Sequence, residues 1–252
     1  MLERTKADMM QMKFYGMLST LDLRLGEATS AGWGHGEFLA SVMTDEKLFR
    51  DNIKIDRRLK AARFRVDASL EQFDTTGRRS ISRTQIQDIA TLRWLAEPRN
   101  ILIFGPTGVG KTFLATAIGT HACRQGYSCL FLGVNLLIEK LKMARQDGTF
   151  LRYRERLTKA DLLILDDLGI KQLPPDTVQD LYDILEERYQ SKSTIITTQL
   201  PITNWSEVIP DPVAMEAIVD RLIHGAITLD INGESYRRKR HAVEIDSPKE
   251  SQ

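Results

Sequence analysis

The segment from Gly105 to Thr112 has the strongest chemical signature in the chain. It reads GPTGVGKT and comprises Gly105, Pro106, Thr107, Gly108, Val109, Gly110, Lys111 and Thr112. This matches G-x-x-x-x-G-K-[ST] at every fixed position, in a strand-to-helix context. Glycines let backbone N–H groups turn around phosphate oxygens, and the positive end of the following helix faces the same anion. We expect Lys111 to reach the β- and γ-phosphates of a nucleotide and Thr112 to ligate Mg²⁺. The alternative is a glycine-rich turn without a ligand.

Two adjacent carboxylates, Asp166 and Asp167, end the apolar run in ADLLILDDLG (160–169), about 55 residues after Lys111. Ligands bind at the carboxyl ends of strands in open α/β sheets. There Asp166 would hold Mg²⁺, mostly through water, and Asp167 would polarise the attacking water. Asp also ends many strands without such a role. The acidic pair indicates a nucleotide site only in combination with the phosphate loop.

The two motifs together predict a nucleoside triphosphatase. A small-molecule kinase shares the first motif but normally lacks the second carboxylate, because a substrate hydroxyl replaces the attacking water. The guanine-reading sequence N-K-x-D does not occur, which favours ATP over GTP.

The elements that must position these residues alternate between strands and helices. Apolar strand patterns occupy residues 100–104, 128–132, 161–166, 193–198 and 226–230. Helical patterns lie near 111–125, 134–158, 175–190 and 212–223. Short apolar strands joined by helical crossovers predict an α/β fold with a five-stranded parallel sheet covered by helices on both faces.

The first part of the chain has a helical pattern instead. We expect a small all-α N-terminal domain over residues 1–74, broken by three glycines near 28–36, with one long helix or a bent pair over 37–65. Residues 75–99 then form a linker and a helix, with Ser82 and Gln85 as a capping box. The ATPase core would span 100–245, and residues 246–252 a disordered tail.

Composition limits the classes of partner. The chain has 252 residues, 27% of them charged, and a net charge of +1, so any contact with nucleic acid must come from a local patch. No apolar run is long enough to span a membrane. The two cysteines suit a reducing environment, and we expect a cytoplasmic protein.

Several segments in this order resemble the AAA+ ATPases, and more narrowly the IstB-like ATPases that assist insertion-sequence transposition, with the DnaC-type helicase loaders as relatives. The segments are SLEQFD (69–74), ERYQSKSTIITTQL, DRLIHGA and GESYR, and the last two are the specific ones. The resemblance implies a P-loop AAA+ core without a C-terminal helical lid.

The same resemblance assigns roles to further residues. Arg221 resembles an arginine finger offered to ATP on a neighbouring subunit, although an ordinary salt bridge is the alternative. Thr198 or Gln199 matches the sensor position, where Asn is usual, and Arg237 matches a second sensor that contacts the nucleotide. Asp167 stands where most AAA+ enzymes have Glu, which implies slow or conditional hydrolysis.

The resemblance also implies a function. The protein would assemble with ATP and Mg²⁺ as a homo-oligomer on duplex DNA, deform it, and recruit or regulate the transposase of the same element. A helicase loader that binds single strands and a nucleotide-stabilised architectural DNA-binding protein remain alternatives. The candidate DNA-binding residues are Lys140, Lys142 and Arg145 in the basic segment 138–159, and Arg57 and Arg58 before the core. A solvated helix face is the alternative for both groups.

Overall fold

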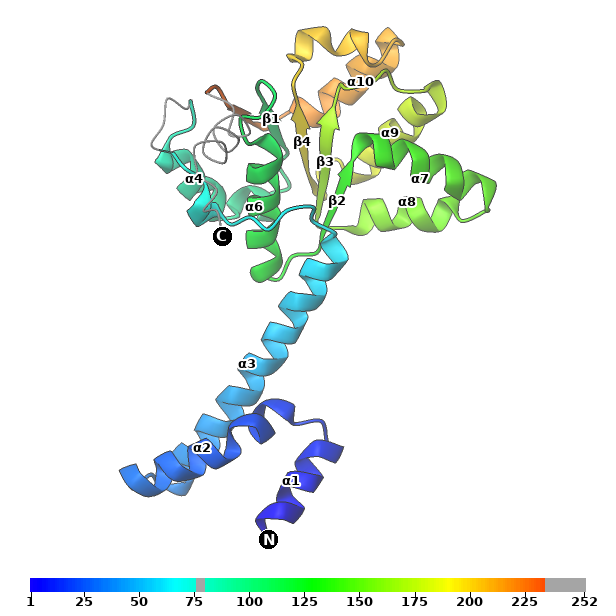
Figure 1. Ribbon diagram of the computed structural model, residues 1–252. Coiled ribbons are helices and arrows are strands. Elements are labelled where there is room, and N and C mark those ends of the chain that lie inside the picture. Colours follow the sequence, from blue (N-terminus) through cyan, green and yellow to red (C-terminus); the bar gives the residue numbers. More distant parts are fainter. Residues whose placement is uncertain (76–79, 234–252) are drawn as a thin grey trace, which may run out of the picture. The chain divides into compact units, whose positions relative to one another are not determined.

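The computed structural model describes residues 1–75 and 80–233, and the chain divides into two compact units, Met1–Arg57 and Arg58–Gln252 (Figure 1). The first unit contains α1 (Leu2–Gln11), α2 (Tyr15–Ala31) and most of α3 (His35–Ala62). The helices of the second are η1 (Leu70–Gln72), α4 (Arg83–Ala90), α5 (Arg93–Ala96), α6 (Lys111–Arg124), α7 (Val134–Gln146), α8 (Phe150–Lys159), α9 (Pro175–Arg188), η2 (Ile202–Glu207) and α10 (Pro212–Ile223). Its strands are β1 (Ile101–Phe104), β2 (Cys129–Gly133), β3 (Leu162–Leu168), β4 (Ser193–Thr198) and β5 (Ile227–Asp230).

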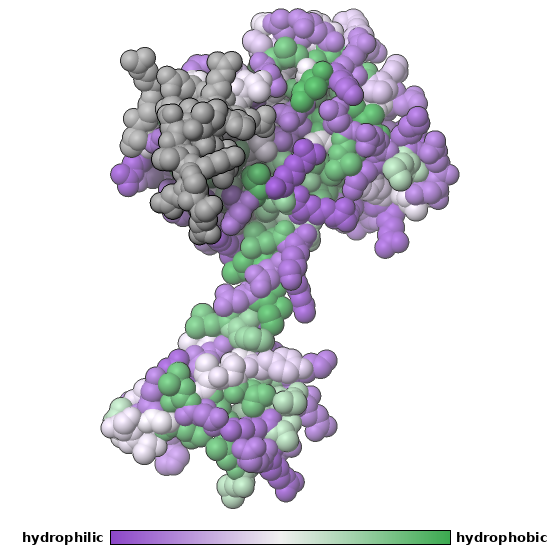
Figure 2. Space-filling model, in the orientation of Figure 1, coloured by the Kyte–Doolittle hydropathy of each residue, from purple (hydrophilic) through white to green (hydrophobic). Residues whose placement is uncertain are grey.

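The N-terminal unit is helical, as the sequence predicts, and has a small core. Met17, Leu21 and Val42 are its buried apolar residues. The buried Glu46 carboxylate on α3 accepts hydrogen bonds from the backbone N–H groups of Gly16 (2.7 Å) and Met17 (3.1 Å), which begin α2. A helix start leaves such donors without intrahelical partners, so Glu46 ties α2 to α3. Figure 2 shows apolar side chains at the surface of this unit. Leu39 and Met43 are among its exposed apolar residues.

The two units divide earlier than the boundary expected at residue 74. Residues after Arg57 pack into the second unit, because Ala62, Ala68, Leu70 and Phe73 belong to one of its buried clusters. The helical pattern of α3 continues through the division. A helix therefore joins the units, and helix periodicity alone carries no mark of where one core ends.

The second unit is built on one parallel sheet with the strand order β2-β3-β4-β1-β5, which confirms the predicted fold class. One apolar cluster lies on the face covered by α4, α5 and α6, and another on the face covered by α7, α8, α9 and α10 (Figure 1). Burial on both faces explains why the strands are continuous apolar runs rather than alternating ones.

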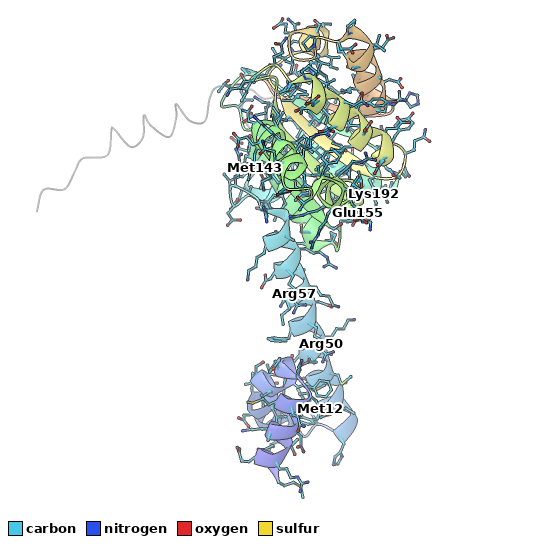
Figure 3. All side chains as sticks on the ribbon, turned by 90° about the vertical axis from the view of Figure 1, so that its right-hand side faces the viewer. Met12, Arg50, Arg57, Met143, Glu155 and Lys192 are labelled. Carbon is cyan, nitrogen blue, oxygen red and sulfur yellow. The ribbon has the colours of Figure 1, made fainter. Side chains whose placement is uncertain are left out.

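The helical segment expected near 134–158 consists of two helices, α7 and α8, which are joined at Asp147, Gly148 and Thr149. Gly148 has φ +75, a left-handed conformation that ends α7 and reverses the chain. The exposed Met143 on α7 and Glu155 on α8 mark this pair of helices in Figure 3. The α4 region divides similarly, since Leu92 has φ +55 between α4 and α5, while the predicted capping box of Ser82 and Gln85 is confirmed.

The predicted tail at 246–252, and the end of the core from residue 234 onward, lie outside the described residues. The expected absence of a lid concerns those residues too. No helix within 1–75 or 80–233 is both long and apolar enough to cross a membrane.

Arg188, at the end of α9, is a fully buried cation that holds α8 to β4. Its guanidinium donates to the carbonyl oxygens of Leu157 (2.9 Å), Thr158 (3.2 Å), Ala160 (2.7 Å) and Ser193, and to the Thr194 hydroxyl (3.1 Å). Burial lowers the pKa of Arg188 to about 9. These carbonyls close α8, where the negative end of the helix dipole favours a cation.

Replacing Arg188 with Met should destabilise the second unit by about 3 kcal/mol or more, because several buried carbonyl groups would lose their donor. Urea unfolding followed by circular dichroism measures this loss. Arg152→Met, which removes an exposed arginine from the same region, is the matched control. A difference below about 1 kcal/mol between the two variants would show that water or rearrangement satisfies these carbonyls.

Candidate nucleotide-binding site

The phosphate loop follows β1 and opens α6, as predicted. Gly105, Gly108 and Gly110 have φ values of +148, +85 and +103, which L side chains rarely adopt. A Cβ on Gly105 would lie 2.2 Å from the carbonyl oxygen of Ile231, so this position also needs glycine for close packing against the chain after β5. Gly110 precedes the first residue of α6, Lys111, and the loop therefore has the left-handed glycines that a backbone anion cradle requires.

Lys111 is buried beneath the loop. Its Nζ donates to the carbonyl oxygens of Gly105 (2.8 Å) and Pro106 (2.9 Å), and the residue is 5% exposed. These contacts hold the ammonium group against the loop backbone. A phosphate in the cradle would meet this charge and the N–H groups at the start of α6 together.

Asp166 lies at the carboxyl end of β3 and is 1% exposed. It accepts hydrogen bonds from the hydroxyl groups of Thr112 (3.0 Å) and Thr197 (2.6 Å). Burial, aided by the charge of Asp167, raises the pKa of Asp166, while the two hydroxyl groups and the Arg65 guanidinium act in the opposite direction.

The donor set at this point fits a hard divalent cation. The Thr112 hydroxyl and the Asp166 carboxylate are oxygen ligands that Mg²⁺ prefers, and a buried carboxylate gains from a cation beside it. Thr112 and Asp166 are thus the residues that would hold Mg²⁺, which, when bound, would neutralise phosphate charge.

Asp167 departs from regular strand geometry. Its φ is +62, and the β3–β4 register shifts between Leu165 and Leu168. The Asp167 backbone N–H donates to the Thr197 hydroxyl (2.9 Å), and the residue is half-buried. Such a bulge re-aims a side chain beside a site. The bulge gives the two adjacent carboxylates different environments, because Asp166 is buried and Asp167 is partly accessible to solvent.

Gln199 contacts the phosphate loop directly, because its Oε1 accepts a hydrogen bond from the Thr107 hydroxyl (2.7 Å). The Thr198 hydroxyl instead accepts from the backbone N–H of Leu200 (3.1 Å). Of the two sensor candidates, Gln199 is therefore the one that the fold brings to the loop.

Comparison with known proteins agrees with this geometry. The family described as IstB-like ATP binding protein matches residues 7–243. The chain belongs to this family. An insertion sequence ATP-binding protein of Sinorhizobium fredii is 38% identical over 89% of this chain and 92% of its own length. A protein of Mycobacterium tuberculosis, named as an ATP-binding protein in an insertion sequence, is 34% identical over 91% of this chain and 92% of its own length.

Solved structures show the same fold at lower identity. DnaI has a TM-score of 0.56 at 23% identity and covers 67% of the IstB-like chain and 89% of its own. The DnaC helicase loader has the same TM-score and identity and covers 66% and 97%. These likenesses support the AAA+ architecture alone.

Arg221 of the IstB-like chain lies away from its own phosphate loop. The Asn100 side chain, just before β1, donates to the carbonyl oxygens of Arg221 (3.0 Å) and Leu222 (3.1 Å). The phosphate loop begins at the opposite end of β1 from Asn100, and a four-residue strand is about 13 Å long. The Arg221 side chain pairs with Glu186 on α9 (2.5 Å) and lies over the Tyr182 ring. Arg237 lies outside the described residues.

The sequence did not predict the contacts of two further residues with Asp166. Thr197 joins Asp166 and Asp167 through one hydroxyl, and Arg65 brings a positive charge near Asp166. Thr197 had a signal, since polar residues end a strand that is otherwise apolar. Arg65 had none, because it comes from a part of the sequence far from both motifs.

Replacing Thr197 with Val should lower kcat for ATP hydrolysis by about 10- to 100-fold, because the Asp167 N–H loses its acceptor and Asp166 loses a donor. Steady-state phosphate release measures the effect. Thr197→Ser, which retains the hydroxyl, should preserve most of the activity. Equal activity in Thr197→Val and wild-type protein would remove Thr197 from the site.

Proposed function

We propose that the chain is an ATP-hydrolysing switch that assembles on duplex DNA in the cytoplasm, deforms the duplex, and recruits or regulates the transposase of its insertion sequence. ATP-bound subunits form the assembly and hydrolysis releases it. Membership of the IstB-like family and relatives named from insertion sequences support the biological context.

The observation that carries the proposal is the separation of Arg221 from its own phosphate loop. The Arg221 backbone is tied to Asn100 at the opposite end of β1, and its guanidinium pairs with Glu186, so in this proposal Arg221 serves the ATP molecule of a neighbouring subunit. Breaking its ion pair with Glu186 costs little, because the Glu186 side chain is 47% exposed. ATP bound between subunits then couples assembly to nucleotide state.

Within the site, each residue has one task. Lys111 and the loop N–H groups hold the phosphates, and Thr112 with Asp166 would hold Mg²⁺. Asp167, beside Asp166 but more accessible to solvent, orients the attacking water. Gln199 links the loop to β4 and reports the γ-phosphate.

The DNA-binding candidates separate into two groups. Arg145 pairs with Asp180 and lies over the Phe150 ring. Arg154, a further arginine of the basic segment 138–159, pairs with Glu187, so these two arginines hold α7 and α8 to neighbouring side chains. Lys142 is exposed, and Lys140 is half-buried in a basic environment. Burial, with the charges of Arg63 and Arg156, lowers the pKa of Lys140. A phosphate there would relieve the repulsion among these cations.

On α3, Arg57 is exposed (Figure 3). Arg58 lies beside Gly126, 4.0 Å from the position of an added Cβ. Both remain candidates for backbone contact. Such contacts are largely independent of sequence, and bending the duplex at a cost of a few kcal/mol would favour deformable targets.

Arg221→Ala should lower kcat by roughly 10³-fold while nucleotide binding persists, because the finger acts on the neighbour's ATP. Lys111→Ala should be inactive for a different reason, the loss of its own phosphate contacts. Mixing the two inactive variants should restore a measurable fraction of phosphate release, since Lys111→Ala subunits still offer Arg221. No recovery in the mixture, with both variants folded and assembling, would refute the role of Arg221 in trans.

Fluorescence anisotropy on duplex and single-stranded probes, with ATP, ADP or no nucleotide, tests the DNA-binding function. We expect ATP-dependent binding that favours duplex and is lost in Lys111→Ala. Lys142→Ala should weaken binding and reduce the salt slope by about 0.9. Arg154→Ala, whose cation is already paired, is the matched control. Tighter binding to single-stranded than to duplex probes would favour a helicase loader. Equal DNA affinity with ATP, with ADP and without nucleotide would favour an architectural DNA-binding protein.

A further inference from the structure

The segment after α3 is fastened to the nucleotide-binding core. Arg63 has φ +60, which ends α3 and reverses the chain. The next residue, Phe64, packs against α6 and β2: a Cβ on Gly119 would lie 2.8 Å from its ring, and its ring centroid lies 6.2 Å from that of Phe131. Because α6 begins at Lys111, Phe64 anchors this segment to the helix of the phosphate loop.

Arg65 extends the contact to the sheet edge. A Cβ on Gly133 would lie 2.7 Å from the Arg65 Nη2 atom and 3.3 Å from its Cζ atom, so the guanidinium rests directly on the Gly133 backbone. Gly133 is the last residue of β2 and pairs in register with Asp166. The site that would hold Mg²⁺ is therefore one strand away from this cation.

Arg65 has no ion-pair or hydrogen-bond partner among residues 1–75 and 80–233, and its side chain is exposed. The exposed guanidinium lies on Gly133, the residue that pairs in register with Asp166, and its charge favours the ionised form of the Asp166 carboxyl group. Gly133 has φ −68 and ψ 139, which any residue adopts, so the backbone does not require glycine there. A Cβ added there would meet the end of the Arg65 side chain and would displace it.

We propose that Arg65 is a positioning residue that transmits metal–nucleotide binding at Asp166 to the end of α3. Mg²⁺ and the Arg65 guanidinium are like charges near one carboxylate, so binding of the metal weakens the placement of Arg65 on Gly133. Release of Arg65 loosens the Arg63–Arg65 segment and the last turn of α3 before it. This rests on the magnesium site of the proposed function, and it adds a route by which nucleotide state reaches the helix that joins the two units.

Two measurements test the proposal without relying on turnover. In the first, a fluorescent non-hydrolysable ATP analogue is titrated with Mg²⁺. Arg65→Gln should lower the half-saturating Mg²⁺ concentration by about 3- to 10-fold, because a nearby like charge is removed. Arg65→Lys should behave more like wild type, and Arg152→Gln, the same charge change at an exposed site on α8, should leave Mg²⁺ dependence unchanged.

In the second, hydrogen exchange is followed at residues 59–62, the last turn of α3. Wild-type amides there should exchange about 3-fold faster with Mg²⁺ and the analogue than without, as expected for partial fraying of a helix end. Gly133→Ala, whose new methyl displaces the guanidinium, should exchange fast in both conditions. If Gly133→Ala fails to fold, Arg65→Gln provides the same comparison.

The outcomes separate this proposal from the proposed function. Two results would overturn the role of Arg65 alone. One is normal analogue binding with the same half-saturating Mg²⁺ concentration in Arg65→Gln and wild type. The other is an amide exchange rate at residues 59–62 that is the same with and without Mg²⁺ and the analogue. Absence of Lys111-dependent analogue binding in the wild type would overturn the proposed function and the role of Arg65 together.

Discussion

The site depends on one buried carboxylate. Asp166 is almost fully removed from water at the end of β3, where an unpaired charge is costly, and the Thr112 and Thr197 hydroxyl groups meet it from α6 and β4. These hydrogen bonds align the first turn after the phosphate loop with two neighbouring strands. The same Thr197 hydroxyl accepts from the Asp167 N–H and so sets the bulge that separates the two acidic residues. The relative placement of Thr112, Asp166 and Asp167 therefore follows from how one buried charge is satisfied.

A second buried charge organises the opposite face of the sheet. Arg188 donates hydrogen bonds to the carbonyl groups at the end of α8 and the start of β4. Asp180 on α9 forms an ion pair with Arg145 on α7. The α7–α8 pair is therefore held to α9 and β4 by polar contacts with buried groups as well as by apolar packing. Basic residues that take part in these contacts stabilise the fold, and the exposed Lys142 takes part in none of them.

The chain shares its fold with DnaI and DnaC, and a fold by itself carries no information about the partner of a protein. Outside the sheet of this chain lie the α7–α8 pair, the N-terminal unit and the segment that joins it to the second unit. Arg65 and Phe64 lie at that joining segment and touch both β2 and α6, so the joining segment is itself part of the nucleotide-binding unit.

The sequence by itself determined the parallel α/β core, the phosphate loop and the acidic pair, because each is written in contiguous residues with a local geometric requirement, such as left-handed glycines between a strand and a helix. It also determined the helical N-terminal unit through periodicity. It did not separate α7 from α8, since a glycine inside a helical pattern can be tolerated or can end the helix. Only the tertiary structure decided that Gln199 meets Thr107, that Arg145 and Arg154 are already paired, that Arg221 lies at the far end of β1, and that Thr197 and Arg65 belong to the site. Those facts are contacts between residues distant in sequence, and side-chain hydrogen bonds across a sheet leave no periodic signal in the chain that forms them.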